Sequence, residues 1–169
     1  MGWDKKYNSV AYDLACDKYD RCSIVPERKA NFEIGEIKTI YISELLRTYE
    51  TACKIFGKIN FLKTPLLNEV PLKSFKDTEH MYPLWLWNLM GRLQWFIQNK
   101  RQVEGKKETI VRASQMIDLL EKNQDDCCVI THGFYMRTFI KELKTHGYKI
   151  ERSNLLGISN LDKIIAIKY

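Results

Sequence analysis

The sequence lacks any apolar run long enough to cross a membrane. Its most apolar window, residues 81–97, is short for a membrane span and contains Asn88, Arg92 and Gln94. Residues 1–20 are polar and charged, so they do not resemble a secretion signal. We therefore predict a soluble protein with no membrane partner.

The sequence also lacks the cysteine spacing of a disulfide framework or a metal site. Its five cysteines make an odd number, and they are Cys16, Cys22, Cys53, Cys127 and Cys128. An odd count without a secretion signal favours reduced thiols and a cytoplasmic location. Cys127 and Cys128 are neighbours on a predicted strand, so their side chains would point to opposite faces. We expect neither a metal nor another cofactor.

An acidic excess is absent, and so are internal repeats and low-complexity linkers. The 27 Lys and Arg against 21 Asp and Glu give a net charge of +6, which suits an anionic partner. The lysines are scattered from Lys5 to Lys168, however, which favours a solvated basic surface over a nucleic-acid track. A basic nucleic-acid binder remains an alternative, and we expect no nucleic-acid partner. With 45% hydrophobic residues over 169 positions, the chain is expected to form one domain over residues 1–169.

Strand and helix patterns alternate along the chain. Helical spacing of apolar residues predicts helices over residues 7–19, 44–56, 83–98, 107–122 and 134–143. Strands are predicted over residues 39–42, 60–63, 127–131 and 164–167, the third of them buried on both faces. Ser43 is expected to cap the second helix, Gly57 to follow it and Gly147 to end the last helix, while residues 24–35 read as a loop. This order predicts an α/β protein, a three-layer α/β/α sandwich around a largely parallel sheet.

The strongest local signal for chemistry is the segment Val-Ile-Thr-His-Gly at residues 129–133. A buried strand would deliver His132 at its C-terminal tip, the edge where open α/β sheets bind ligands. The helix that follows offers backbone N–H groups and a partial positive charge suited to phosphate. Gly133 would let the backbone pass close to a ligand.

Two further segments have the same strand-then-polar-residue arrangement. Arg47 follows the strand 39–42 in the first turns of the next helix, where a guanidinium can bind two phosphate oxygens at once. Glu69 lies in a loop after the strand 60–63, where a carboxyl group can protonate a leaving oxygen if its pKa is raised. Each residue taken singly has an ordinary structural explanation, but together they point to a phosphoryl site.

The combination resembles the histidine phosphatase superfamily, whose phosphoglycerate mutase-like members share a Ser-x-Leu-x-Arg-x-x-x-Thr-Ala joint, a Leu-x-Glu loop and a later strand ending in His-Gly. The likeness covers roughly residues 38–145. It implies that Arg47 holds the phosphoryl group, that Glu69 donates a proton and that His132 stabilises the transferring phosphoryl. The implied activity is metal-independent hydrolysis of a small phosphorylated substrate whose identity the sequence does not give.

The family's Arg-His-Gly segment, which supplies the nucleophilic histidine, is missing from residues 1–6, where it would stand before the first helix. Without a histidine to attack phosphorus, we expect an inactive or weak phosphatase, N-terminally truncated relative to the family. The alternative is a non-catalytic pseudoenzyme that binds a phospho-ligand without turning it over. The resemblance also implies that the missing strand is central, so its loss would expose strand edges and favour self-association or marginal stability.

Two other segments have features that suggest a function. Cys22 and Arg28 have the Cys-x5-Arg spacing of cysteine-dependent phosphatases, but Pro26 removes a backbone donor and Glu27 would repel phosphate. Residues 78–104 are expected to form a helical insertion near the pocket, from which Arg92 and Arg101 could reach a second anionic group. A helix that packs its aromatic residues on the core explains this stretch more simply. The charged residues 106–108, before Arg112, are explained most simply as the start of an amphipathic helix.

Overall fold

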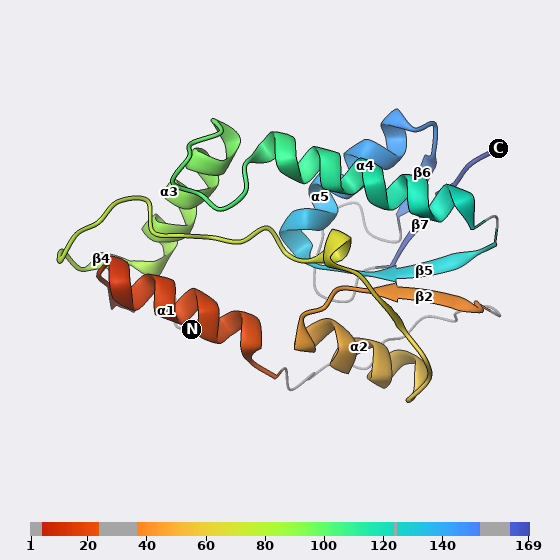
Figure 1. The fold of residues 1–169 in the computed structure, drawn as a ribbon, viewed down its shortest axis with the longest axis horizontal. Coiled ribbons are helices and arrows are strands. Elements are labelled where there is room, and N and C mark those ends of the chain that lie inside the picture. Colours follow the sequence, from red (N-terminus) through yellow and green to blue (C-terminus); the bar gives the residue numbers. More distant parts are fainter. Residues whose placement is uncertain (1–4, 24–36, 124, 153–162) are drawn as a thin grey trace. The chain divides into compact units, whose positions relative to one another are not determined.

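A computed structural model describes residues 5–23, 37–123, 125–152 and 163–169 (Figure 1). The chain divides into two compact units, each described here by itself. The first unit comprises Met1–Cys22 and Val70–Thr109, and the second comprises Ser23–Glu69 and Ile110–Tyr169. Within the described ranges, no helix has both the length and the apolar character needed to span a bilayer. The expectation of one domain over the whole chain stays a prediction.

The first unit contains two helices joined by a minimal sheet. Helix α1 (Ser9–Arg21) begins where the Asn8 side chain accepts a hydrogen bond from the Ala11 amide. Helix α3 (Leu84–Phe96) falls inside the segment expected as a helical insertion. Two-residue strands β1 (Lys6–Tyr7) and β4 (Tyr82–Pro83) pair in antiparallel fashion just before these helices. Neither short strand was predicted.

Trp87 is the centre of the core of the first unit. Its side chain is fully buried, its indole N–H donates to the Tyr7 carbonyl at 2.9 Å, and its ring stacks on Tyr12 at 5.1 Å. Phe75 and Tyr82 complete the aromatic cluster around it. The prediction that this helix packs an aromatic stripe on a core is therefore confirmed for Trp87.

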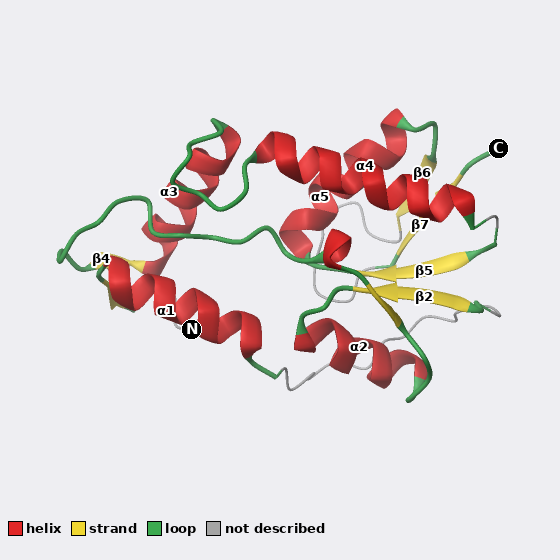
Figure 2. Ribbon diagram, viewed as in Figure 1, coloured by secondary structure: helices red, strands yellow, loops and turns green. Residues whose placement is uncertain are grey.

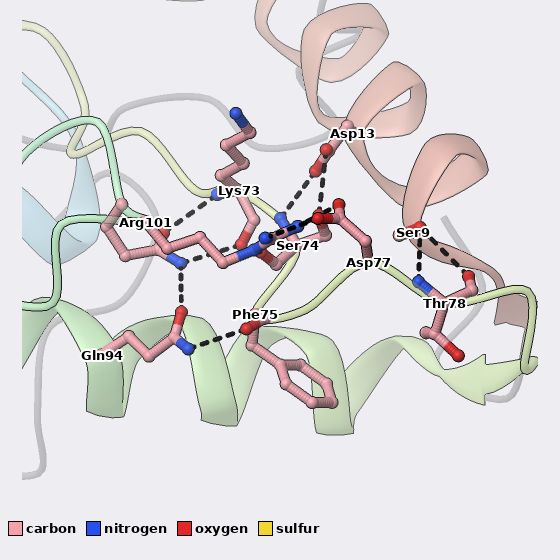
Figure 3. A network of polar contacts seen from close by, with 10 residues as sticks. Ser9, Asp13, Lys73, Ser74, Phe75, Asp77, Thr78, Gln94 and Arg101 are labelled. Atoms are coloured by element: carbon pink, nitrogen blue, oxygen red, sulfur yellow. Dashed lines mark hydrogen bonds and ion pairs between the residues drawn. The ribbon is translucent and has the colours of Figure 1, made fainter.

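A polar network holds the segment before β4 against both helices of this unit (Figure 3). The Asp13 carboxylate on α1 accepts hydrogen bonds from the amide and hydroxyl of the buried Ser74 at 2.6 and 3.0 Å. Arg101 forms a two-pronged ion pair with Asp77 and also donates to the Ser74 carbonyl. These contacts give Arg101 a structural role in the first unit.

The second unit is built on a parallel sheet of order β3-β2-β5 (Figure 2). Strand β2 (Thr39–Ile42) lies between β3 (Leu62–Lys63) and β5 (Cys127–Ile130). Helix α2 (Leu46–Phe56) connects β2 to β3. The 3-10 turn η1 (Pro65–Leu67) follows β3, and helix α4 (Lys106–Lys122) precedes β5. Helix α5 (Gly133–Thr145) follows β5, and the hairpin β6 (Lys149–Arg152) and β7 (Ile164–Ile167) forms a separate antiparallel pair.

Alternate residues of β2 face opposite layers. Ile40 and Ile42 are buried against α2, where Ala52 is also fully buried. Tyr41, between them, points the other way, and its hydroxyl accepts a hydrogen bond from Asn123 just after α4. Figure 1 shows α2 on one side of the sheet and α4 and α5 on the other. The predicted α/β fold with helices on both faces of a parallel sheet is confirmed.

The predicted burial of the third strand is wrong. All four residues of β5 are only partly buried, although the run Cys127–Ile130 is apolar throughout. The reason is that β5 lies at an edge of the sheet: β2 pairs with one side of it, and among the described residues no strand pairs with the other. An apolar strand of this kind is usual in the middle of a parallel sheet.

Several predicted boundaries also change. Leu45, rather than Ser43, is the N-cap of α2, because the Ser43 hydroxyl is engaged at the sheet edge. Strand β6 was not predicted, and the predicted strand 60–63 shortens to two residues. The predicted loop 24–35 lies outside the described residues, as does most of the Cys22–Arg28 segment.

Candidate functional site

Two parallel strands bring Ser43 and His132 to the same edge of the sheet. Ile42, the last residue of β2, is in register with Ile130, the last residue of β5. Ser43 follows β2 by one residue, and His132 follows β5 by two. The Ser43 hydroxyl lies 2.8 Å from His132 Nε2, and Ser43 is fully buried. This is the C-terminal edge of the strands, where a parallel sheet presents residues to a ligand.

Arg47 reaches the same histidine from the first turn of α2. Its Nε donates a hydrogen bond to His132 Nδ1 at 3.2 Å. Both side chains are largely buried, with 8% and 7% of their surfaces exposed. The two residues that the sequence assigned to one phosphoryl site are thus in direct contact.

Burial and positive charge keep the His132 ring neutral. The pKa of His132 is lowered from an ordinary 6.5 to about 3, mostly by loss of solvent and in addition by the positive charges of Arg47 and Arg112. A guanidinium beside an imidazole disfavours a second positive charge. The ring therefore stays uncharged at neutral pH.

This depressed pKa predicts a loss of stability in mild acid. The unfolded chain protonates His132 near pH 6.5 while the folded chain does so only near 3, so stability present above pH 6.5 is lost as the pH falls through this window. Between pH 7 and 5 the loss from this group is about 2 kcal/mol in the free energy of unfolding. Urea unfolding of wild type and His132→Gln at both pH values measures it. We expect the wild type to lose more stability than the variant, and equal losses would contradict the prediction.

The side chain of Glu69, which comes from the loop after η1, contacts the first turn of α5. Its carboxylate accepts hydrogen bonds from the amides of Tyr135 at 2.9 Å and Phe134 at 3.3 Å. The sequence assigned these amides to a phosphate, but here a carboxylate of the same chain binds them. Thr131 donates to the Leu67 carbonyl at 2.7 Å and so ties the turn before Glu69 to the end of β5. The role of Glu69 as a proton donor stays a prediction.

Arg112 is a residue of this region that the sequence analysis missed. From α4, its guanidinium donates to the carbonyls of Asn68 at 2.7 Å and Leu66 at 3.1 Å, and it lies over the Tyr135 ring at 4.5 Å. It therefore holds the turn that presents Glu69. The sequence shows only charged residues near the start of a helix, and this pattern does not distinguish an arginine that binds loop carbonyls from one exposed to solvent.

The remaining predicted residues are less constrained. Gly133 is the first residue of α5, and a Cβ there would meet nothing within 4 Å, so the backbone has open space beside it. Arg92 belongs to the first unit, where its guanidinium donates to the Val70 carbonyl at 3.1 Å. The substrate-binding roles of Gly133 and Arg92 stay predictions.

The other histidines lie elsewhere in the fold. His146 caps the far end of α5, about 20 Å along the helix from His132, and its Nε2 lies 3.2 Å from the Ser114 hydroxyl. His80 belongs to the first unit, where its ring meets Tyr82 edge-on. Among the residues that the structure describes, no cluster of His, Cys, Asp and Glu is suited to a metal ion.

The comparison with protein-family models shows which family this chain belongs to. Residues 25–165 match the model of the histidine phosphatase superfamily, branch 1. The chain belongs to this superfamily. Among curated proteins, none is similar enough in sequence to count as a match.

Among solved structures, one that the chain resembles is a mutant phosphoserine phosphatase from Entamoeba histolytica in complex with phosphoserine. The two chains are 20% identical with a TM-score of 0.47, over 79% of this chain and 63% of that one. The present chain thus spans less than two thirds of the length of that protein.

Proposed function

We propose that this member of the superfamily binds a small phosphorylated ligand through Arg47 and His132, with Glu69 bound to the first turn of the helix that follows His132. The contact between Arg47 and His132 at the C-terminal edge of the sheet carries the proposal. A buried guanidinium offers paired, charge-assisted N–H donors to a phosphoryl group.

We further propose that this chain hydrolyses phosphomonoesters weakly or not at all. A histidine phosphatase needs a histidine to attack phosphorus, and the sequence contains only three histidines. His132 is engaged with Arg47 and Ser43, and His146 lies at the other end of α5. His80, the third, belongs to the first unit and contacts the Tyr82 ring. These observations favour the second candidate function, a pseudoenzyme that holds a phospho-ligand without turnover.

Turnover and binding can be measured side by side. Hydrolysis of a generic aryl phosphate reports the first, and calorimetric titration with inorganic phosphate or vanadate reports the second. We expect binding with little or no turnover, and loss of binding in His132→Ala but not in His146→Ala, the matched change at the far end of α5. Turnover abolished by His132→Ala would instead favour the enzyme, and no binding at all would contradict the proposal.

Within the described ranges, no strand pairs with the second edge of β5, and this supports a proposal about self-association. An apolar strand with one open edge is a template for pairing with another chain. We expect the weight-average mass in sedimentation experiments to rise over a tenfold increase in protein concentration. A monomer that persists over this range would contradict the proposal.

A further inference from the structure

The donor and the acceptor of each hydrogen bond around His132 can be assigned from the chemistry of its partners. Arginine Nε only donates, so Nδ1 of His132 must accept the bond from Arg47. In a neutral imidazole the other nitrogen then carries the proton. Nε2 therefore donates to the Ser43 hydroxyl, 2.8 Å away.

The next links follow from the same accounting. The Ser43 oxygen also accepts from the Leu45 amide at 3.2 Å, so its own proton points to the Thr48 hydroxyl at 2.8 Å. Thr48 in turn donates to the Leu45 carbonyl at 2.7 Å. Each N–H and hydroxyl donor in this series of hydrogen bonds therefore has an acceptor, as buried polar groups require. Ser43 and Thr48 are both buried, so bulk water is not needed to complete it.

We infer that Ser43 is a positioning residue that, together with Arg47, holds His132 as the neutral Nε2–H tautomer. The inference deepens the proposed function and rests on it in one respect, that His132 contacts the phosphoryl group. In this tautomer His132 offers a hydrogen-bond donor rather than a base. A phosphoryl oxygen that takes this N–H replaces Ser43 as the acceptor.

The same arrangement excludes a serine nucleophile at this site. A serine 2.8 Å from a histidine Nε2 has the spacing of a nucleophile and its general base. Here, however, Nε2 already carries a proton and cannot take one from Ser43. The charged groups that act on the ring are Arg47 from α2 and Arg112 from α4. The Glu69 carboxylate is bound to the amides of Phe134 and Tyr135 in the first turn of α5.

Nitrogen-15 NMR of the full chain with labelled histidine tests the inference directly. In the wild type we expect His132 to show a protonated Nε2 and an unprotonated Nδ1, unchanged between pH 5 and 8. Ser43→Ala should speed solvent exchange of the Nε2 proton by about tenfold or more, because its acceptor is gone. Ser43→Thr, which keeps a hydroxyl, should retain slow exchange, and Arg47→Met should populate the Nδ1–H tautomer.

Ser114→Ala is the matched control, because Ser114 bears the same relation to His146 Nε2. It should alter the His146 signals and leave those of His132 unchanged. A wild-type His132 that is charged or Nδ1-protonated at pH 7 would overturn the inference, as would unchanged exchange in Ser43→Ala. If added vanadate left the His132 signals unmoved, the proposed function would fail while the tautomer assignment stood.

Discussion

Arg47→Ala is expected to weaken phosphate or vanadate binding by about 10- to 150-fold, the equivalent of losing a charge-assisted hydrogen-bond donor worth about 1.5–3 kcal/mol. Arg47 is buried beside His132, where an anion would be poorly screened by solvent. The substitution also removes one of the causes that lower the pKa of His132, so that pKa should rise. Calorimetric titration of both proteins measures the change.

The control for this prediction is a second arginine. Arg137 is exposed on α5, so Arg137→Ala changes the net charge by the same amount without touching the site. We expect it to alter the dissociation constant less than about threefold at physiological salt. Arg47→Lys should recover only part of the affinity, because an ammonium group lacks the planar fork. Equal losses in Arg47→Ala and Arg137→Ala would mean that net charge, rather than the site, attracts the anion.

Trp87→Ala is expected to have the largest effect on stability, about 3–5 kcal/mol in the free energy of unfolding of the first unit. The side chain is fully buried, stacks on Tyr12 and satisfies the Tyr7 carbonyl through its indole N–H. Its removal leaves a cavity in a unit whose aromatic cluster is small. Urea unfolding monitored by near-ultraviolet circular dichroism measures the loss.

Trp85 provides a control on the same helix. Its side chain is 50% exposed, so Trp85→Ala makes the same chemical change with little loss of packing. We expect a destabilisation below about 1 kcal/mol. Similar losses in the two variants would show that helix α3 does not bury Trp87 in the way described.

The sequence predicted the elements that local chemistry determines. The β-branched and aromatic run Thr39–Ile42 is a strand with the predicted bounds. Gly57 and Gly147 both follow helices with positive φ angles, of 77° and 87°, a conformation that favours glycine. Arg47 and His132 could be assigned to one site because both follow strands, and parallel strands present their C-terminal ends on one edge.

The sequence could not predict features that depend on distant partners. The contact between Ser43 and His132 needs Ile42 opposite Ile130, and no local pattern specifies this register. Ser43 was therefore assigned to a helix cap. Arg112 bonds to carbonyls more than forty positions away in the chain. The partial burial of β5 likewise depends on which strands pair with it, and its apolar residues do not reveal that.

The Glu69 carboxylate at the start of α5 also determines how an anion would enter this edge of the sheet. The amides of Phe134 and Tyr135 already carry a negative partner supplied by the chain. An incoming phosphate that uses these amides must displace that partner, so its uptake is an exchange rather than a simple addition. We expect such a site to discriminate by charge, because a dianion would compete with a tethered carboxylate better than a weakly held monovalent ion such as chloride.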